Sequence, residues 1–332
     1  MRDASPPLVL TITPGRAGSV FLADVLARGT RGGAEITHER LGPDRTLPRI
    51  FFHPFDEARQ YELATFPPVA EFLTQVEQTL EAGTAVVEVG MFTSHLVPLL
   101  AERFPKQLRV LALFRHPLLT AASHSLRGMY HPWPHWSFFA LANITPFDPG
   151  MLAPGFRTRW QTMTPFERNL YSWTEYVLLW QRFKKAYSTI PALAVSSEEL
   201  FADPGRVIRT VADFAGVIGD WPANAARRNE LEGKSPRRYG LESNWRERIG
   251  LHPELQTAAA FMGYRLDDQR VLEKMKKYEA PRDVGNRLLR NVGYFGVRSY
   301  VHRLTSRRFW RYRSRLKMLT RTYPDYSRQM FG

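Results

Sequence analysis

An arginine and a serine lie among closely spaced glycines near the start of the chain, in the sequence PGRAGS at residues 14–19. When such a loop opens a helix, unpaired backbone N–H groups and the helix dipole both favour a bound anion. Arg16 adds a positive charge and Ser19 a hydroxyl donor, while Gly15 and Gly18 have no side chain to hold an anion away from the backbone. The stretch therefore predicts a site for a phosphate-like group; the alternative is an ordinary strand-to-helix turn.

A second cation and a second hydroxyl occur farther along the chain, at Arg115 and Ser123. Arg115 directly follows an apolar, strand-like run, and Pro117 suits the first turn of a helix. This pattern places Arg115 at the end of a strand and Ser123 two turns along the next helix. A planar donor fork and a compact hydroxyl predict a second phosphate site, with a surface arginine and an ordinary helical serine as the alternative.

Two residues have the chemistry of a general base. Glu39 follows a strand-like run at residues 34–37, and His95 follows another at residues 84–89. Ligands bind at the carboxyl ends of strands in open α/β sheets, so both side chains are candidates to accept a proton from a hydroxyl group. Other roles stay open, because Glu39 could pair with an arginine and His95 could be a hydrogen-bonding residue at a helix start. The sequence slightly favours Glu39 as the base.

Apolar runs that alternate with helical patterns position these residues. Strands are expected at residues 8–13, 34–37, 84–89, 108–114 and 192–195, with helices between them. The alternation predicts an α/β protein of three layers with a central parallel sheet. The run at residues 108–114 is the most apolar and is expected at the centre of the sheet. Residues 42–66 predict no element.

Residues 128–160 combine many aromatic side chains with prolines and glycines. An irregular segment of this length inside a compact domain is typical of a lid or a binding loop. We therefore expect it to cover the acceptor side of the site. An aromatic satellite core beneath a loop is the alternative.

Composition limits the chemistry and the setting of the protein. The 332 residues include no cysteine, which excludes disulfides, thiolate catalysis and cysteine-bound zinc. No spacing of His, Asp and Glu is typical of a metal site, so we expect no metal. The absence of an apolar run of about 18 residues and of a signal-like start predicts a cytoplasmic protein, soluble or peripheral to a membrane.

The net charge of +14 belongs mainly to the end of the chain. Residues 282–332 carry 13 Arg and Lys against two Asp, so we expect a catalytic domain over residues 1–281 and a basic helical extension over 282–332. Nucleic acid is not an expected partner. Apolar residues recur in the extension at helical spacing, which is typical of a helix at an anionic membrane surface, here the inner face. Docking of that helix on the catalytic domain is the alternative.

Two segments resemble the nucleotide-binding motifs of sulfotransferases. The first loop is similar to their 5′-phosphosulfate loop: Arg16, Gly18 and Ser19 match the pattern, whereas Ala17 and Val20 depart from it. In this loop an extra residue, Gly15, displaces the proline of the pattern. Arg115 and Ser123 have the spacing of the family's 3′-phosphate motif.

A third segment resembles the R-K-G loop of cytosolic sulfotransferases. Arg237 and Arg238 precede Tyr239, which stands in place of the lysine, and Gly240 and Trp245 keep the family's spacing. The resemblance extends over roughly residues 8–265.

The resemblance implies a P-loop-like sulfotransferase fold and an enzyme that transfers a sulfuryl group from 3′-phosphoadenosine 5′-phosphosulfate, releasing adenosine 3′,5′-bisphosphate. The acceptor would be a hydroxyl group of a carbohydrate, a lipid or another small molecule. Glu39 lies where bacterial and protein-tyrosine sulfotransferases have a catalytic glutamate, and His95 lies where the cytosolic enzymes have a catalytic histidine. The donor-binding residues implied are Gly15, Arg16, Ala17, Gly18, Ser19, Val20, Phe21, Arg115, Ser123, Arg237, Arg238, Tyr239 and Gly240.

Two other functions compete with this one. A small-molecule kinase or another P-loop nucleotide enzyme would require Mg²⁺ and ATP. We expect neither the lysine of a Walker A loop nor a Walker B acid in this sequence, which argues against such an enzyme. A non-catalytic protein that binds a membrane or a polyanion would need the basic extension but neither Arg16 nor Glu39.

Overall fold

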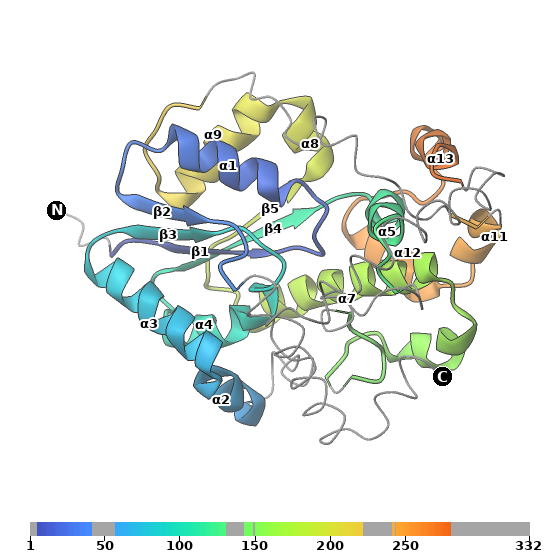
Figure 1. Ribbon diagram of the computed structural model, residues 1–332, viewed down its shortest axis with the longest axis horizontal. Helices are drawn as coiled ribbons and strands as arrows, with labels where there is room; N and C mark the ends of the chain where they lie inside the picture. Colours follow the sequence, from blue (N-terminus) through green and yellow to red (C-terminus); the bar gives the residue numbers. More distant parts are fainter. Residues whose placement is uncertain are drawn as a thin grey trace, which may run out of the picture.

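A parallel β-sheet with helices on both faces forms the centre of the molecule (Figure 1). The computed structural model describes residues 5–41, 57–130, 143–148, 150–221, 241–242 and 244–279. Within these residues the strands are β1 (Leu8–Ile12), β2 (Ala34–Thr37), β3 (Ala85–Glu88), β4 (Leu108–Phe114) and β5 (Ala192–Ser196). The expected α/β class, with three layers and a parallel central sheet, is confirmed.

The strand order is β2-β3-β1-β4-β5, so β1 occupies the centre of the sheet. The expectation that residues 108–114 form the central strand was wrong by one position. β4 has strands on both sides and is buried, which explains its apolar sequence, but the same holds for β1. An apolar sequence indicates that a strand is buried on both faces of the sheet, but it does not give the order of the strands.

Helices at the expected places cover the sheet. They are α1 (Ser19–Gly29), α3 (Pro67–Glu81), α4 (Val97–Arg103), α5 (Pro117–Ser125), α7 (Pro165–Ala186) and α9 (Pro204–Ala215). The sequence predicted no element at residues 42–66, yet α2 (Glu57–Thr65) lies partly there. Among the described side chains of α2 only Leu63 is buried, so this helix lacks the apolar stripe that periodicity detects.

Further elements complete the described chain. They are the 3₁₀ helices η3 (Ser94–Leu96) and η4 (Pro154–Thr162) and the helices α8 (Ser197–Ala202), α11 (Trp245–Ile249), α12 (Pro253–Phe261) and α13 (Gln269–Lys276). No helix within the described ranges combines the length and apolarity needed to cross a membrane.

Alternate residues of β1 pack into two separate apolar layers. Leu8 and Leu10 belong to a core shared with α3 and α7, while Val9 faces the other side and packs with α1 and α9. Side chains of successive strand residues point to opposite faces, so one five-residue strand anchors both layers. All five residues of β1 are completely buried.

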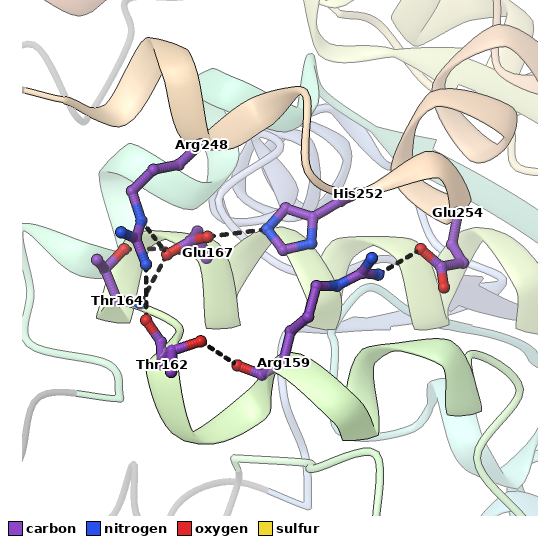
Figure 2. A network of polar contacts seen from close by, with 7 residues as sticks. All are labelled: Arg159, Thr162, Thr164, Glu167, Arg248, His252 and Glu254. Carbon is purple, nitrogen blue, oxygen red and sulfur yellow. Dashed lines mark hydrogen bonds and ion pairs between the residues drawn. The ribbon is translucent and has the colours of Figure 1, made fainter.

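A network of polar side chains joins the start of α7 to the chain around α11 and α12 (Figure 2). Thr164 caps α7, and the Glu167 carboxylate completes a capping box by accepting a hydrogen bond from the Thr164 N–H at 2.8 Å. The same carboxylate accepts Arg248 Nε at 2.6 Å and lies 3.0 Å from His252 Nε2. Glu167 therefore ties a segment some eighty residues away to the longest described helix.

The described part of the expected lid is anchored in the core. Leu152 and Ala153 donate their N–H groups to the Glu175 carboxylate at 2.9 and 2.8 Å, and the side chains of Phe156 and Trp160 are buried. These residues therefore match the alternative of an aromatic core beneath a loop. Residues 131–142 and Pro149 of the expected lid, and the basic extension at 282–332, lie outside the described residues.

We predict that Glu167→Gln lowers the free energy of unfolding by about 3 kcal/mol at neutral pH, the range for a broken buried ion pair. Burial opposes the charge of Glu167, but hydrogen bonds from His252, Thr164 and Arg248 outweigh burial and lower the pKa of this carboxyl to about 2. The folded pKa lies below the ordinary value of 4.5. This stabilisation is therefore present above pH 4.5 and is lost as the pH falls towards 2.

Urea unfolding of the two proteins across this pH range measures the difference. Glu254→Gln is the control, because it breaks only the partly exposed Arg159–Glu254 pair and should cost less than about 1 kcal/mol. A gap between parent and Glu167→Gln that stays constant down to pH 2 would contradict the assignment.

Candidate active site

The loop between β1 and α1 is tightly turned, with several residues in left-handed backbone conformations. Gly15 and Gly18 have φ values of 79° and 96°, and Arg16, which is not a glycine, also has a left-handed φ of 57°. The Thr13 hydroxyl accepts the Gly15 N–H at 3.2 Å, and the Thr13 N–H donates to Ser94 Oγ at 3.2 Å. The loop is therefore held at its base by β1 and by η3.

A buried histidine on α5, His124, contacts the backbone of the same loop. His124 Nε2 lies 2.9 Å from the Pro14 carbonyl oxygen, and since a carbonyl can only accept, this nitrogen carries the proton. Burial, with the charge of Arg16 as the next cause, lowers the pKa of His124 to about 3. The ring is therefore neutral at physiological pH and acts as a fixed donor.

The two anion-binding motifs of the sequence meet in space. Arg16 Nε donates to Ser123 Oγ at 3.0 Å, across 107 residues of sequence. Arg115 follows β4, and its carbonyl oxygen accepts Trp173 Nε1 of α7 at 2.9 Å. Burial is the main cause that lowers the pKa of the neighbouring His124, and the charges of Arg16 and Arg115 lower it further. The structure thus brings Arg16, Arg115 and Ser123 to one edge of the sheet.

Glu39 lies on the turn after β2, next to the loop. Burial, and then the charge of Glu88, raise the pKa of Glu39 to about 7, although the charge of Arg16 opposes the rise. His38 Nε2 lies 3.9 Å from the Glu39 carboxylate and 3.2 Å from Ser19 Oγ. Glu39 keeps 27% of its side chain exposed, so solvent or a ligand can reach it.

His95 is placed differently from Glu39. It lies in η3, only 5% of the residue is exposed, and its ring packs 5.3 Å from that of Tyr176 on α7. Burial lowers the pKa of His95 to about 3. Burial and then the charge of Glu39 raise the pKa of Tyr176. His95 is thus a buried residue that packs against α7 and is far less accessible than Glu39.

The remaining predicted site residues fall into three groups. Ser19 is at the start of α1 and Val20 is partly exposed, whereas Ala17 and Phe21 face the apolar layer around α1. Only the backbone of Ala17 and Phe21 remains for a ligand, because the amphipathic α1 buries their side chains. Four residues lie outside the described chain: Arg237, Arg238, Tyr239 and Gly240.

Trp245, which the third motif contains, lies in the protein core rather than at this edge. Its side chain is fully buried, its ring packs 6.1 Å from Phe166, and Nε1 donates to Glu279 at 3.1 Å. Its partners come from α7 and from the chain after α13, and no spacing in the sequence could have named them.

Sequence analysis missed two residues of the site. His124 directly follows Ser123, and its position one residue farther along α5 turns it inward under the loop. Glu88 ends the apolar strand β3 beside β1, so the sequence does contain an acid at the place where a Walker B acid was thought missing. An acidic residue closing an apolar run was the available signal. Within the described ranges, His, Asp and Glu side chains form no group of three suited to a metal ion.

Comparison with known proteins gives likenesses among solved structures. No family model matches the chain, and no curated protein does either. A sulfotransferase from Alicyclobacillus acidocaldarius is 16% identical with a TM-score of 0.48, and the match covers 80% of this chain and 98% of that one. The sulfotransferase domain of the Synechococcus PCC 7002 olefin synthase is 16% identical with a TM-score of 0.45, covering 80% and 97%.

A third match is the sulfotransferase domain from the curacin biosynthetic pathway. It is 13% identical with a TM-score of 0.43, and the match covers 79% of this chain and 99% of that one. Likenesses at this level assign no activity to the chain.

We predict that His124→Gln flattens the acid side of the stability profile. The folded pKa of about 3 lies below the ordinary 6.5, so the unfolded chain binds the proton more readily and stability falls as the pH drops from 6.5 towards 3. This ring should cost the parent about 1.4 kcal/mol per pH unit in that window. Glutamine keeps an N–H donor for the Pro14 carbonyl but does not titrate there.

Urea unfolding above and below pH 6.5 measures the effect. His124→Leu is the matched comparison: it also removes the titration, but leaves the Pro14 carbonyl without its donor and should lose about 1–3 kcal/mol even above pH 6.5. Equal slopes for the parent and His124→Gln would show that the ring is not held neutral.

Proposed function

We propose that the protein is a sulfotransferase that uses 3′-phosphoadenosine 5′-phosphosulfate as donor and a hydroxyl group as acceptor. The observation that carries the proposal is the contact of Arg16 with Ser123, because it joins two anion motifs that lie far apart in the sequence. A candidate base, Glu39, lies beside the same arginine.

The donor has two anionic ends, and the site offers separate groups for each. The loop at Gly15 and Gly18, with Arg16, would hold the 5′ end, and Arg115 with Ser123 would hold the 3′-phosphate. The half-buried positions of Arg16, Arg115 and Ser123 leave these groups reachable for a ligand. When bound, the donor would supply the sulfuryl group and leave as adenosine 3′,5′-bisphosphate.

Arg16 would stabilise the negative charge that develops on the leaving group. Its backbone is fixed by a loop tied to β1 and η3, and its side chain is oriented by Ser123. A cation that is already in place needs no reorganisation during the reaction, and such preorganised charge is typically the largest catalytic term.

Glu39 would accept the proton of the acceptor hydroxyl. A base works best with a pKa near the operating pH, and the pKa of Glu39 is raised to about 7 by burial and by Glu88. His95 is almost fully buried with a pKa lowered to about 3, so it is the weaker candidate for this step.

The alternatives make different demands on the same residues. A P-loop kinase would need a lysine in the loop, where this chain has Ala17 and Gly18 before Ser19. It would also need an acid free for Mg²⁺, but the Glu88 carboxylate accepts hydrogen bonds from Thr37 and from the Arg40 N–H. A non-catalytic polyanion-binding protein would leave Arg16 and Glu39 dispensable.

We predict that the protein binds adenosine 3′,5′-bisphosphate more tightly than ATP with Mg²⁺, and that Arg115→Ala weakens this binding about 10- to 100-fold, the value of a charge-assisted hydrogen bond. Binding of adenosine 5′-phosphosulfate, which lacks the 3′-phosphate, should change little. Isothermal calorimetry measures both ligands. Arg103→Ala is the control, because Arg103 pairs with Glu77 on the helical face remote from the loop. Equal losses for the two ligands would refute the 3′ role of Arg115.

We predict that Glu39→Gln lowers kcat for sulfuryl transfer about 100-fold or more while donor affinity stays unchanged, since the group acts on the acceptor proton. The parent rate should fall as the pH drops below about 7, where the Glu39 carboxyl takes up its proton. His95→Ala should keep that pH dependence. Transfer of radioactive sulfate from the donor to a panel of phenolic and carbohydrate acceptors gives the rates. A large loss in His95→Ala with normal turnover in Glu39→Gln would reverse the assignment.

A further inference from the structure

Glu88 is a buried carboxylate that the proposed reaction does not use directly. It is the last residue of β3 and pairs in parallel register with Thr37, the last residue of β2. Its accessible surface is zero, in a region where a charged group is costly unless hydrogen bonds compensate it. The packing of the sheet alone gives no reason for an acid at this position.

Within the described chain, donors to the Glu88 carboxylate come from the turn that carries Glu39. The Thr37 hydroxyl donates to Glu88 Oε2, and the Arg40 N–H lies 3.3 and 3.4 Å from the two carboxylate oxygens. Burial raises the pKa of Glu88, and hydrogen bonds from this turn oppose the rise. One carboxylate therefore holds donors from both ends of the turn, on either side of Glu39.

The turn needs such a support, because its backbone is unusual. Glu39 has a φ of 55°, a left-handed conformation that residues other than glycine rarely adopt. Gly90 leaves room for it: a Cβ added at Gly90 would lie 2.8 Å from Glu39 Cγ and 3.1 Å from Glu88 Oε1. The side chains of Glu39 and Glu88 thus both lie close to Gly90, just after β3.

We propose that Glu88 is the positioning residue of the base: its carboxylate fixes the turn at residues 37–40, and its negative charge acts directly on the Glu39 carboxyl. The inference rests on the proposed role of Glu39. Among the residues that the structure describes, the other charged or titratable groups that interact with Glu39 include Arg16 from the loop after β1, His38 from the same turn and Tyr176 from α7. The charge of Glu88 raises the pKa of Glu39 and the charge of Arg16 lowers it.

Glu88→Gln tests both effects of Glu88, on the turn and on the Glu39 carboxyl, and a control variant distinguishes them from a general loss of stability. The amide keeps the size of the side chain but removes the charge, so the pKa of Glu39 should fall by about one unit or more. Its NH₂ group also faces backbone donors, which should loosen the turn and lower kcat on the order of 10- to 100-fold. Glu35→Gln is the control: Glu35 lies on β2 and pairs with the Arg40 side chain, so the change removes a nearby carboxylate but leaves the hydrogen bonds of Thr37 and of the Arg40 N–H to Glu88 in place.

The main measurement is an NMR titration of the carboxyl carbons in full-length protein labelled with ¹³C-glutamate, with Glu39→Gln identifying the signal. We expect Glu39 to titrate near 7 in the parent and in Glu35→Gln, and at lower pH in Glu88→Gln. The acid limb of the pH–rate profile should move in the same direction. An unmoved Glu39 titration in Glu88→Gln, or an equal shift in Glu35→Gln, would overturn the proposal.

Glu88→Asp keeps the test decisive if Glu88→Gln does not fold. Aspartate retains the charge but shortens the reach to the turn, so the Glu39 titration should stay near its parent value while kcat falls. A normal kcat in Glu88→Asp would overturn the positioning role. The titration needs neither donor nor acceptor, so a parent without transfer activity would refute the proposed function while the effect of Glu88 on Glu39 is still measured.

Discussion

The burial of β1 between β3 and β4 is the constraint on which the arrangement of the site depends. Parallel strands that lie side by side end at the same edge, so the segments after β1, β3 and β4 must meet there. The turn after β2 joins them from the neighbouring position. Residues separated by about a hundred positions in the sequence, such as Arg16 and Ser123, become direct neighbours as a consequence.

Burial, as well as direct contact between groups, determines which titratable side chains at this edge are charged. Arg16 and Arg115 are half-buried at this edge, while the buried histidines His95 and His124 stay neutral because burial lowers their pKa values. His124 can therefore support the loop as a simple donor without adding to the positive charge. Burial, and then the negative charge of Glu88, favour a proton on Glu39 near neutral pH. A cationic site and a proton acceptor can thus lie side by side.

The long helix α7 connects this edge to the rest of the described chain. Its Trp173 bonds the carbonyl of Arg115, its Tyr176 packs on His95, and its first turn holds the segment around α11 and α12 through Glu167. Figure 1 shows α7 running from below the sheet towards α11 and α12. The walls of the site and the C-terminal helices therefore share one rigid element.

The sequence by itself determined the features that depend on neighbouring residues. The strand, loop and helix that begin at residue 8 and the proline-led α5 were predicted, because glycine and proline act within a few residues. The placement of Arg16, Arg115 and Glu39 after strands, and of Ser123 on the helix after β4, followed from the same local patterns. Helix α2 was missed, since its described side chains show no apolar stripe.

Tertiary structure alone decided which of these residues touch. The order of the strands placed β1 rather than β4 at the centre, and only this order sets Glu88 beneath the turn of Glu39 and His124 beneath Pro14. The packing also placed Trp245 in the core and the His95 ring against Tyr176, where burial lowers the pKa of His95. These contacts could not be predicted from the sequence, because burial and long-range contacts depend on how distant segments pack. A local sequence pattern does not identify the residue that will lie opposite in the sheet.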